Sequence, residues 1–434
     1  MKIYIETLGC AKNTAEIENV LIDIDNAAYE FTGIPGEADI MIVHTCAFIE
    51  QATKESIGRI LSLAKNKSKS QKLIVTGCIV QRYKSELEKL LPEIDKFVGT
   101  GELGNLVNII LKQDTKRLYL SSPGGYLESP ANRHLILPNQ PWKYVRIAEG
   151  CNNNCSFCII PQLRGKYRSR TMENIVSEIK YLIDNGIKEI NIIGQDIGLY
   201  GVDIYGTPSL TKLLKEILKI KKYFWLRLLY IHPKHVTNEL ISLIANEDRI
   251  CNYLDMPVEH ISDKLLSLCR RHVTKKETYK TIEKLHNKIP GFILRTSLIL
   301  GLPEETKKDM DELKELVNTG YIQRLGIFEY SPNETSQLTR TYPKYKVNHK
   351  LFDKNNKELL SIYTRQAVEY NKSLTGKKTE ALICSKNTCR DYRYAPEVDG
   401  EMVIGNPEGK KNNIGEFTSG TITEFRKMLP IIKL

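Results

Sequence analysis

Short apolar runs alternate with amphipathic, helix-like stretches along most of the chain. In residues 1–118 these runs lie at 3–7, 39–45, 72–77 and 96–100. Near-continuous apolar runs of this length are typical of parallel strands that helices cover on both faces. The pattern therefore predicts an α/β fold that begins with an N-terminal doubly wound parallel-sheet domain.

The same alternation returns at residues 141–370, after a segment at 119–140 that is rich in Pro, Gly and Ser and that we expect to be a linker. Six βα units predict a central partial (βα)6 barrel, whose parallel sheet has fewer strands than a full eight. The six apolar runs span residues 144–150, 189–195, 225–230, 253–258, 292–301 and 324–331.

The pattern changes for the last time at residues 371–434. Short β-type runs at 380–385 and 401–405 are separated by Gly and Asn turns. Such runs are typical of small all-β modules. We therefore expect a small antiparallel β-barrel at this end of the chain.

Composition limits which partners and which cellular compartment the sequence fits. The 434 residues include 63 Lys and Arg against 52 Asp and Glu, a net charge of +11, which permits a nucleic acid or ribosome as partner without requiring one. Uncharged apolar runs stay below the about 18 residues of a membrane span, and the first residues lack the apolar part of a signal peptide. Ten cysteines then indicate a reducing cytoplasm, where metal binding or catalysis is a commoner use of cysteine than disulfides.

The strongest chemical signal is the segment GCNNNCSFC at residues 150–158. Cys151, Cys155 and Cys158 could share one helix face, but the Gly and three Asn favour turns over that helix. A structural zinc site would prefer four protein ligands, and only three lie here. Three thiolates can bind three irons of a 4Fe–4S cluster, which leaves the fourth iron open to an outside ligand.

This C-x3-C-x2-C spacing after the first strand of a βα barrel resembles the radical S-adenosylmethionine superfamily. The resemblance implies that S-adenosylmethionine is a cofactor that binds the open iron through its amino and carboxylate groups. One electron from the cluster then releases a 5′-deoxyadenosyl radical, and the barrel excludes water from it.

Three further cysteines each follow an apolar run. Cys10 comes after 3–7, Cys46 after 39–45 and Cys78 after 72–77. Since the carboxyl ends of parallel strands lie at one edge of a sheet, these three thiols should converge there. Inert buried cysteines are the alternative, but three successive strand ends with a cysteine favour a second three-thiolate 4Fe–4S site.

Two such sites followed by a small β module resemble the methylthiotransferase family over essentially the whole chain. The resemblance implies that the N-terminal cluster carries the sulfur to be inserted. It also implies that one S-adenosylmethionine methylates this sulfur and that a second S-adenosylmethionine supplies the radical. The last domain would then be a TRAM-like barrel. The segments that carry it are ETLGCAKN (6–13), HTCAFI (44–49), TGCIVQR (76–82), AEGCNNNCSFCIIPQLRGKYRSR (148–170) and LGLPEET (300–306).

Within that family the chain looks like the RimO type, which modifies an aspartate of the twelfth small-subunit ribosomal protein at the decoding centre. The resemblance implies that ribosomal protein as substrate and a flavodoxin or ferredoxin as electron donor. The MiaB type, which acts on an isopentenylated adenosine beside the tRNA anticodon, is the alternative. The segments behind this choice are CIIPQLRGKYRSR (158–170), GQDIGLYGVDIYG (194–206), RLLYIHP (227–233), YLDMPVEHISDKLL (253–266) and APEVDG (395–400).

The resemblance also implies cofactor contacts. Gln195 and Asp196, after the second barrel strand, are candidates for the methionyl amine of S-adenosylmethionine. Gly301 and Pro303, after the fifth, are candidates for its adenine, although a turn explains Gly and Pro equally well. Phe157 could pack on the adenine or simply on the core.

Four basic residues follow the cysteine loop: Arg164, Lys166, Arg168 and Arg170. At the mouth of a barrel they could hold an acidic or phosphate-bearing substrate. A solvated charged face is the alternative.

Two positions beside the expected cluster ligands depart from the family pattern. The family often has Asp-Ser-Glu where this chain has Glu16-Ile17-Glu18, and Asn where it has His44. These departures concern the surroundings of the cluster rather than its thiolates.

Two functions of another class fit parts of the sequence. An iron–sulfur electron carrier would normally use four cysteines for each cluster. An RNA-binding or ribosome-binding module would account for a small β-barrel, but not for six placed thiols.

Overall fold

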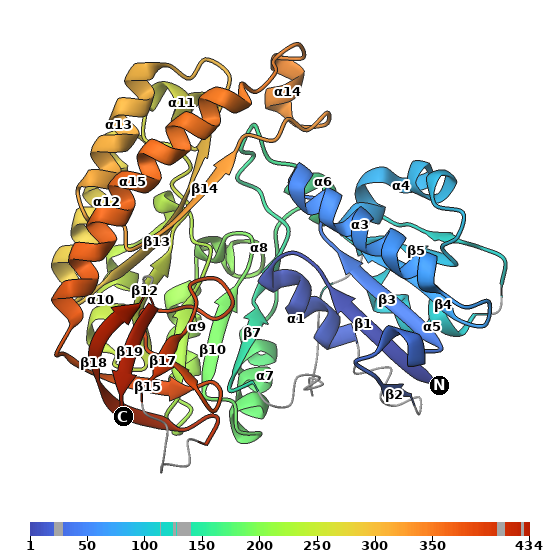
Figure 1. Cartoon of the computed structure of the whole chain (residues 1–434), viewed down its shortest axis with the longest axis horizontal. Helices are drawn as coiled ribbons and strands as arrows, with labels where there is room; N and C mark the ends of the chain where they lie inside the picture. The colour runs from blue at the N-terminus through green and yellow to red at the C-terminus, as the bar shows by residue number, and fades with distance from the viewer. Residues whose placement is uncertain (21–28, 113, 125–126, 128–139, 406–412, 427–428) are drawn as a thin grey trace.

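The structure is a computed structural model that describes residues 1–20, 29–112, 114–124, 127, 140–405, 413–426 and 429–434. Three units follow one another along the chain, and each is built on its own sheet (Figure 1). Most of the expected linker at 119–140 lies outside the described residues. Among the described residues, no helix combines the length and the apolar character that crossing a bilayer requires.

The N-terminal unit is a six-stranded sheet in the order β2-β1-β3-β4-β5-β6, and all its neighbouring strands are parallel. Its strands are β1 (Lys2–Thr7), β2 (Glu30–Phe31), β3 (Ile40–Thr45), β4 (Lys72–Gly77), β5 (Lys96–Val98) and β6 (Leu118–Tyr119). Its helices are α1 (Ala11–Val20), η1 (Pro35–Glu37), α3 (Glu50–Asn66), α4 (Cys78–Leu90), η2 (Thr100–Asn105) and α5 (Leu106–Leu111).

Alternate residues of the central strands serve two apolar cores. Ile40 and Ile42 pack with α1 and α5 on one face of the sheet. Met41 and Val43 pack with α3 and α4 on the other face. This two-sided burial confirms the predicted doubly wound domain and explains why the central runs lack polar alternation. Strands β2 and β6 were not predicted, because two residues are too few to form a pattern.

The central unit confirms the predicted partial barrel. Its six parallel strands lie in the order β14-β13-β12-β11-β10-β7, and the sheet stays open between its first and last strands. The strands are β7 (Trp142–Arg146), β10 (Glu189–Ile193), β11 (Trp225–Leu228), β12 (Ile250–Asp255), β13 (Ile293–Leu300) and β14 (Arg324–Glu329). A two-stranded antiparallel ribbon, β8 (Ala148–Glu149) and β9 (Arg168–Ser169), brackets the cysteine loop.

Helices cover the outer face of this sheet, where the largest apolar core lies. Thr274 begins α12 and Thr306 begins α13 with a reciprocal capping box, which satisfies backbone N–H groups that the first turn leaves free. The helices are α6 (Ile160–Arg164), α7 (Met172–Asp184), η3 (Ile197–Leu199), α8 (Val202–Tyr205), α9 (Leu210–Ile217), η4 (Pro233–His235), α10 (Asn238–Asn246), α11 (Asp263–Leu268), α12 (Lys275–Lys288), α13 (Lys307–Asn318), α14 (Gln337–Thr341) and α15 (His349–Leu374).

The C-terminal unit is the expected closed small β-barrel, in the order β15-β16-β17-β19-β18. The pair β17–β19 is parallel, and the other pairs are antiparallel. The strands are β15 (Lys378–Ile383), β16 (Thr388–Arg390), β17 (Met402–Ile404), β18 (Phe417–Arg426) and β19 (Leu429–Lys433).

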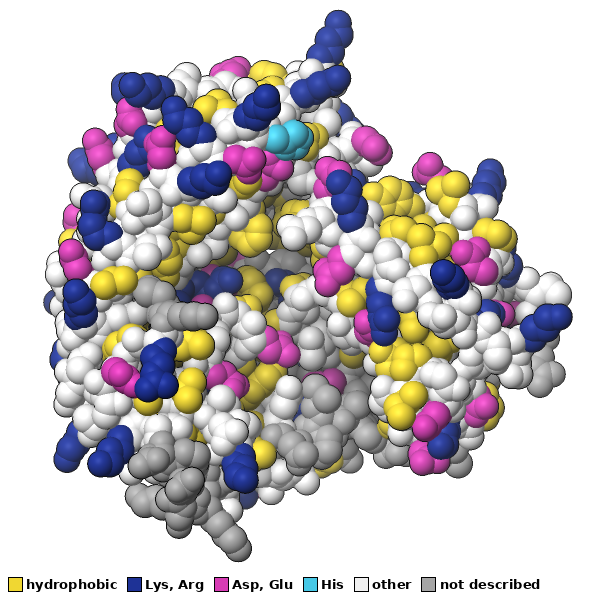
Figure 2. Space-filling model, viewed as in Figure 1, with side chains coloured by type: hydrophobic (Ala, Val, Ile, Leu, Met, Phe, Trp, Pro, Cys, Tyr) yellow, Lys and Arg dark blue, Asp and Glu magenta, His cyan; other side chains and the backbone are white. Residues whose placement is uncertain are grey.

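The inner face of the central sheet is covered by the other two units. Ala11 and Ala15 of α1 pack there with Trp142 and Tyr144 of β7. From the β-barrel, the backbone oxygen of Pro396 accepts a hydrogen bond from Tyr144 at 3.1 Å. Figure 2 shows that the molecule is hollowed where the three units meet, with hydrophobic and basic side chains visible in the hollow.

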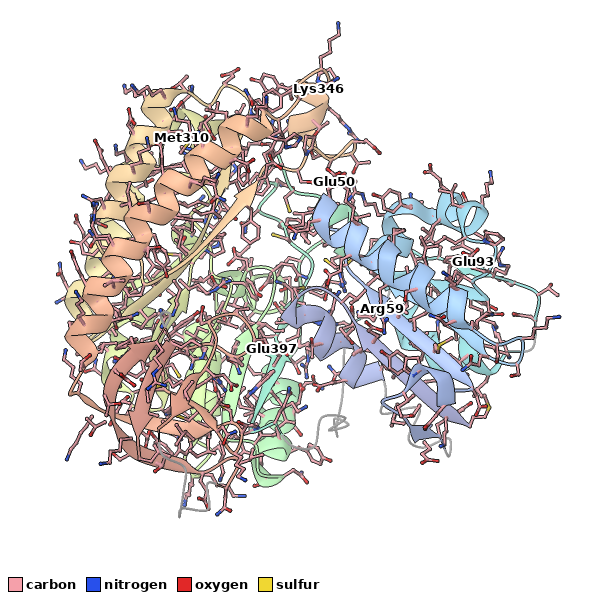
Figure 3. All side chains as sticks on the ribbon, in the orientation of Figure 1. Glu50, Arg59, Glu93, Met310, Lys346 and Glu397 are labelled. Atoms are coloured by element: carbon pink, nitrogen blue, oxygen red, sulfur yellow. The ribbon has the colours of Figure 1, made fainter. Side chains whose placement is uncertain are left out.

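Further along the same barrel segment, Asp399 accepts a hydrogen bond of 2.7 Å from Tyr253 of β12. Glu397 lies near the middle of the molecule (Figure 3) and accepts a bond of 3.1 Å from Tyr144. The segment around 392–399 thus contacts the middle of β7 and β12 on the inner face of the sheet.

A buried carboxylate joins the β-barrel to the central sheet. Glu189 of β10 pairs with Arg227 of β11 and with Arg390 of β16, each at 2.7 Å, and all three side chains are fully buried. Removing one member of a buried ionic cluster leaves charges without partners in a medium that solvates them poorly.

We therefore expect Glu189→Ala to lower the free energy of unfolding by about 3–5 kcal/mol. Urea titration followed by circular dichroism measures this loss. The matched control is Glu216→Ala, which removes a surface pair with Lys219 and should cost about 0.5 kcal/mol or less. Equal losses in the two variants would contradict the proposed role of the buried pair.

Candidate active site

Cys10, Cys46 and Cys78 lie at one edge of the N-terminal sheet. They follow β1, β3 and β4, which are neighbours in the sheet and run parallel. The pKa of the Cys46 thiol is raised by burial and, to a smaller extent, by charge interactions with Cys78 and Cys10. Strands separated by more than 25 residues of sequence thus bring their thiols to one edge of the sheet, which is what three ligands of one cluster require.

Two glycines allow the loops at this edge to approach so closely. A Cβ on Gly9, whose φ is +100°, would lie 2.4 Å from the Cβ of Cys46. A Cβ on Gly77, whose φ is +99°, would lie 2.7 Å from the backbone oxygen of Thr45. Each glycine directly precedes a cysteine, so the positive φ and the missing side chain set where the thiol points.

Burial raises the pKa of the Cys46 thiol to about 12, and it also raises the pKa of Cys78. The metal-free chain therefore holds these cysteines as neutral thiols. Binding to iron must release their protons, because the thiolate is the form that ligates a metal.

The loop between β8 and α6 contains Cys151, Cys155 and Cys158 and has no helical residues. The alternative, in which the three cysteines share one face of a helix, is therefore not found. Asn154 has a φ of +55°, which suits the turn that three Asn predict. Burial raises the pKa of Cys151 to about 11 and also raises the pKa of Cys158.

Every thiol of this loop has a nitrogen donor beside it. The N–H of Asn153 donates to Cys151 at 3.5 Å, and the N–H of Ile160 donates to Cys158 at 3.4 Å. Arg271 donates to Cys155 at 3.4 Å. Hydrogen bonds to sulfur are typical of protein iron–sulfur sites, where they offset the negative charge of the thiolates.

The donor set at both places suits a cluster. In the described part of the chain, no three His, Cys, Asp or Glu side chains surround a position for a single metal ion. A 4Fe–4S cluster places each of its three thiolates on a different iron, so its ligands lie farther apart than those of one ion. Arg271 was missed by sequence analysis, since one basic residue after α11 carries no signal.

Asp196 is fully engaged within the protein. Its carboxylate accepts hydrogen bonds from Asn153 at 2.7 Å, from His235 at 2.7 Å and from the N–H of Gly198 at 3.1 Å. Burial alone would raise its pKa, but the bonds from His235 and Asn153 hold that pKa below its usual range. The carboxylate of Asp196 thus fastens the cysteine loop to the ends of two strands, and its contact with the methionyl amine stays a prediction.

Gln195 presents a free acceptor at the same strand end. Its side-chain nitrogen donates to Glu149 at 3.0 Å. Its side-chain oxygen is buried and has no hydrogen-bond partner among the described residues. A buried amide oxygen without a donor suits a ligand that carries an ammonium group.

Phe157 and the segment after β13 belong to one apolar cluster. Phe157 packs against a core that includes Leu302 and Tyr330. Gly301 has a φ of +79°, and its N–H donates to Glu305 at 3.0 Å. Pro303 is buried in the same turn. The structure thus brings together the three residues expected to hold adenine.

The structure places most of the basic run in contacts within the protein, and its interpretation as a substrate contact stays a prediction. Arg164 and Arg170 are buried, and they pair with Glu16 and Glu178 at 2.6 Å. Arg168 donates to backbone oxygens, including that of Lys166 at 2.8 Å. Of the four basic residues only Lys166 is exposed.

The two departures from the family pattern contact each other. The side chains of Glu16 and His44 are hydrogen-bonded at 3.1 Å and are fully buried. Burial alone would raise the pKa of Glu16, but Arg164 and Arg146 hold it well below its usual range. Burial lowers the pKa of His44, so this ring is neutral.

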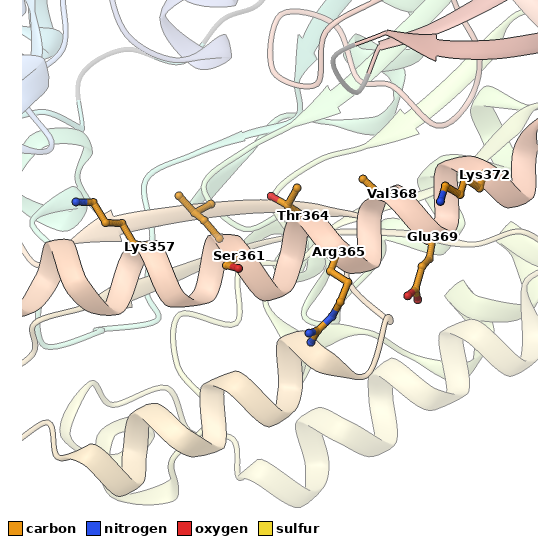
Figure 4. Close-up of a pocket in the computed structure, with 8 residues that line it drawn as sticks. Lys357, Ser361, Thr364, Arg365, Val368, Glu369 and Lys372 are labelled. Atoms are coloured by element: carbon orange, nitrogen blue, oxygen red, sulfur yellow. The ribbon is translucent and has the colours of Figure 1, made fainter.

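A shallow hollow lies elsewhere, on the outer face of α15 (Figure 4). Lys357, Arg365 and Lys372 line it together with Val368 and Glu369. None of the residues that line this hollow belongs to the predicted site, so the hollow is separate from the two sets of cysteines.

Two family models match the chain. The model described as Radical SAM superfamily matches residues 145–317, and the model described as Uncharacterized protein family UPF0004 matches residues 2–99. A protein of Clostridium botulinum (strain Hall) named Ribosomal protein uS12 methylthiotransferase RimO is 38% identical over 432 residues, which are 98% of this chain and 96% of that relative. The protein of the same name from Citrifermentans bemidjiense is 39% identical over 437 residues, 98% of this chain and 96% of that relative.

Solved structures share the fold at low identity. The radical S-adenosylmethionine methyltransferase TsrM from Kitasatospora setae, with cobalamin and a 4Fe–4S cluster bound, has a TM-score of 0.57 at 13% identity and covers 78% of this chain and 73% of its own. The cobalamin-dependent S-adenosylmethionine radical enzyme OxsB has a TM-score of 0.51 at 13% identity and covers 83% of this chain and 56% of its own.

A double-mutant cycle tests the pairing of Glu16 with His44. We expect His44→Asn alone to lower the free energy of unfolding by about 1–2 kcal/mol, because it removes a buried hydrogen bond. Glu16→Asp alone should have a similar cost. The double variant should be more stable than the sum of the singles predicts, by about 1 kcal/mol. Urea titration of the metal-free chain measures all four proteins, and additive costs would contradict the pairing.

The buried carboxyl group of Glu305 predicts that the stability of the fold depends on pH. Burial raises its pKa to about 7, so between about pH 4.5 and 7 the folded chain holds a proton that the unfolded chain has lost. Stability from this group is therefore lost as pH rises through that window. Glu305→Gln should raise the melting temperature relative to wild type more at pH 8 than at pH 5, as measured by calorimetry. Glu304→Gln, at the exposed neighbouring residue, is the control, and an equal difference at both pH values in Glu305→Gln would refute this assignment.

Proposed function

We propose that this chain, which belongs to the RimO family of radical S-adenosylmethionine methylthiotransferases, inserts a methylthio group at an unactivated C–H bond of an aspartate side chain in ribosomal protein uS12. The chain is an enzyme of the transferase class, and its cofactors are two 4Fe–4S clusters and S-adenosylmethionine. The observation that carries the proposal is the placement of six cysteines at the carboxyl ends of two adjoining parallel sheets.

Each set of three cysteines has its own role in this proposal. The N-terminal set, Cys10, Cys46 and Cys78, holds the cluster that carries sulfur. The loop set, Cys151, Cys155 and Cys158, holds the cluster that binds S-adenosylmethionine. When bound, these cofactors supply the radical that abstracts the hydrogen atom and the sulfur that replaces it.

The residues around the loop orient S-adenosylmethionine. The buried oxygen of Gln195 accepts a hydrogen bond from its amino group, since this oxygen has no donor among the described residues. Phe157, Gly301 and Pro303 hold the adenine in the apolar cluster that contains Leu302. Asp196 keeps the loop in place through Asn153.

The three units divide the work. We assign residues 1–118 to the first cluster, 119–140 to a linker, 141–370 to the radical core and 371–434 to the TRAM-like barrel. The barrel segment around 392–399 covers part of the inner face of the core sheet. In this proposal a substrate side chain enters the core interior from the end where the cysteines lie. Exclusion of water from that interior protects a radical from side reactions.

The immediate partners follow from this chemistry. The substrate is a small-subunit ribosomal protein, free or on the ribosome, and the electron donor is of the flavodoxin or ferredoxin class in the cytoplasm. The test is mass spectrometry of uS12 and of tRNA from cells that lack this chain. A methylthio mass lost from uS12 supports the proposal, whereas a loss from tRNA assigns the chain to the modification of isopentenylated adenosine.

Two cysteine variants separate the roles of the two sites. Cys151→Ala should abolish cleavage of S-adenosylmethionine under dithionite, because the loop cluster loses a ligand. Cys46→Ala should keep this cleavage and lose methylthio transfer, and the iron content should fall from about eight to about four atoms per chain. Anaerobic reconstitution, iron analysis and mass spectrometry of a uS12 peptide measure these outcomes.

The matched control is Cys384→Ala, at a half-buried thiol of the β-barrel that lies outside both sets. This variant should keep both activities and the full iron content. Methylthio transfer by Cys46→Ala would refute the role of the N-terminal site. A wild-type chain that binds about four irons or fewer would refute the two-cluster assignment.

A further inference from the structure

A five-residue helix connects the two sets of cysteines. Helix α6 (Ile160–Arg164) starts two residues after Cys158, and its first N–H donates to the sulfur of Cys158 at 3.4 Å. Its last residue, Arg164, donates from its guanidinium to the sulfur of Cys78 at 3.2 Å. A helix of this length spans about 7.5 Å, so one short segment contacts a thiol of each set.

The guanidinium of Arg164 is held in one orientation. One of its nitrogens donates to both oxygens of Glu16, at 2.7 and 2.6 Å. The nitrogen that reaches Cys78 also donates to the side-chain oxygen of Asn13 at 2.9 Å. Arg164 is only 3% exposed, and a buried guanidinium that binds several acceptors is strongly directional.

The rest of α6 is clamped to the N-terminal domain as well. Ile159 and Leu163 pack in the apolar core formed by β3, β4, α3 and α4. Thr100 donates from its hydroxyl to the backbone oxygen of Leu163 at 2.7 Å. The helix therefore belongs to the central unit by sequence and to the N-terminal domain by packing.

We propose that Arg164 is a positioning residue that acts on the N-terminal cluster in two ways. Through α6 it fixes the separation of the two clusters, and through its bond to Cys78 it raises the midpoint potential of the N-terminal cluster. A donor and a positive charge beside a thiolate stabilise the reduced, more negative state of a cluster. The inference rests on the proposed function only in that Cys78 and Cys158 ligate clusters.

The first test measures the potential. Full-length chains that carry Cys151→Ala, Cys155→Ala and Cys158→Ala retain only the N-terminal cluster. In this background, Arg164→Lys should lower the midpoint potential and Arg164→Gln should lower it further, as measured by redox titration with electron paramagnetic resonance. Because lysine keeps the buried positive charge, the midpoint potential of Arg164→Lys is the deciding measurement if Arg164→Gln does not fold.

The matched control is Arg168→Gln, because Arg168 lies in the same segment and donates to backbone oxygens. This variant should leave the potential and the spectrum of the N-terminal cluster unchanged. A folded, loaded Arg164→Lys chain with the parent potential would overturn the electronic part of the proposal. An equal fall in potential in Arg168→Gln would overturn it too.

The second test measures the separation of the clusters. With all six cysteines present and both clusters reduced, the magnetic interaction between them should be uniform in wild type. In Arg164→Gln it should weaken and become heterogeneous. Two clusters with an unchanged interaction in the variant overturn the positioning role alone. A wild-type chain that binds a single cluster overturns the proposed function itself.

Discussion

The ion pair between Glu16 and Arg164 decides how the two cluster-binding units lie against each other. It joins α1 of the first unit to α6 of the second, and Arg146 and His44 complete the contact around the same carboxylate. A carboxylate buried without cations would cost several kcal/mol, so a displaced arrangement of the units is strongly disfavoured. The positions of the cysteines relative to each other therefore follow from a contact that contains no cysteine.

Contacts among the protein's own residues hold both sets of cysteines in place. Gly9 and Gly77 let the strand ends approach, and Asp196 anchors the loop through Asn153. Nitrogen donors already point at four of the six sulfurs. These contacts limit the freedom of the cysteine side chains, and a thiol must lose its proton to ligate a metal.

The sequence predicted the elements that bury a continuous apolar face, because their periodicity shows in the pattern of residues. It also predicted where the thiols at strand ends lie, because the carboxyl ends of parallel strands share one edge of the sheet. It did not predict β2 and β6, which are too short to show a period. It also did not predict that Arg164, Arg170 and Asp196 are buried, because no local pattern separates a solvated charge from one buried against a distant segment. Glu16 meets Arg164 across 148 residues of sequence, and only the folded chain shows that contact.

The order of these contacts along the chain has a consequence for biosynthesis. Glu16, within the first strand–helix unit, receives its guanidiniums from residues 146 and 164. Until residue 164 has been synthesised, Glu16 of the N-terminal unit lacks at least one of its two arginine partners. Domains that emerge first generally fold first, but this one gains the ion pairs of Glu16 only after Arg146 and Arg164 have left the ribosomal exit tunnel.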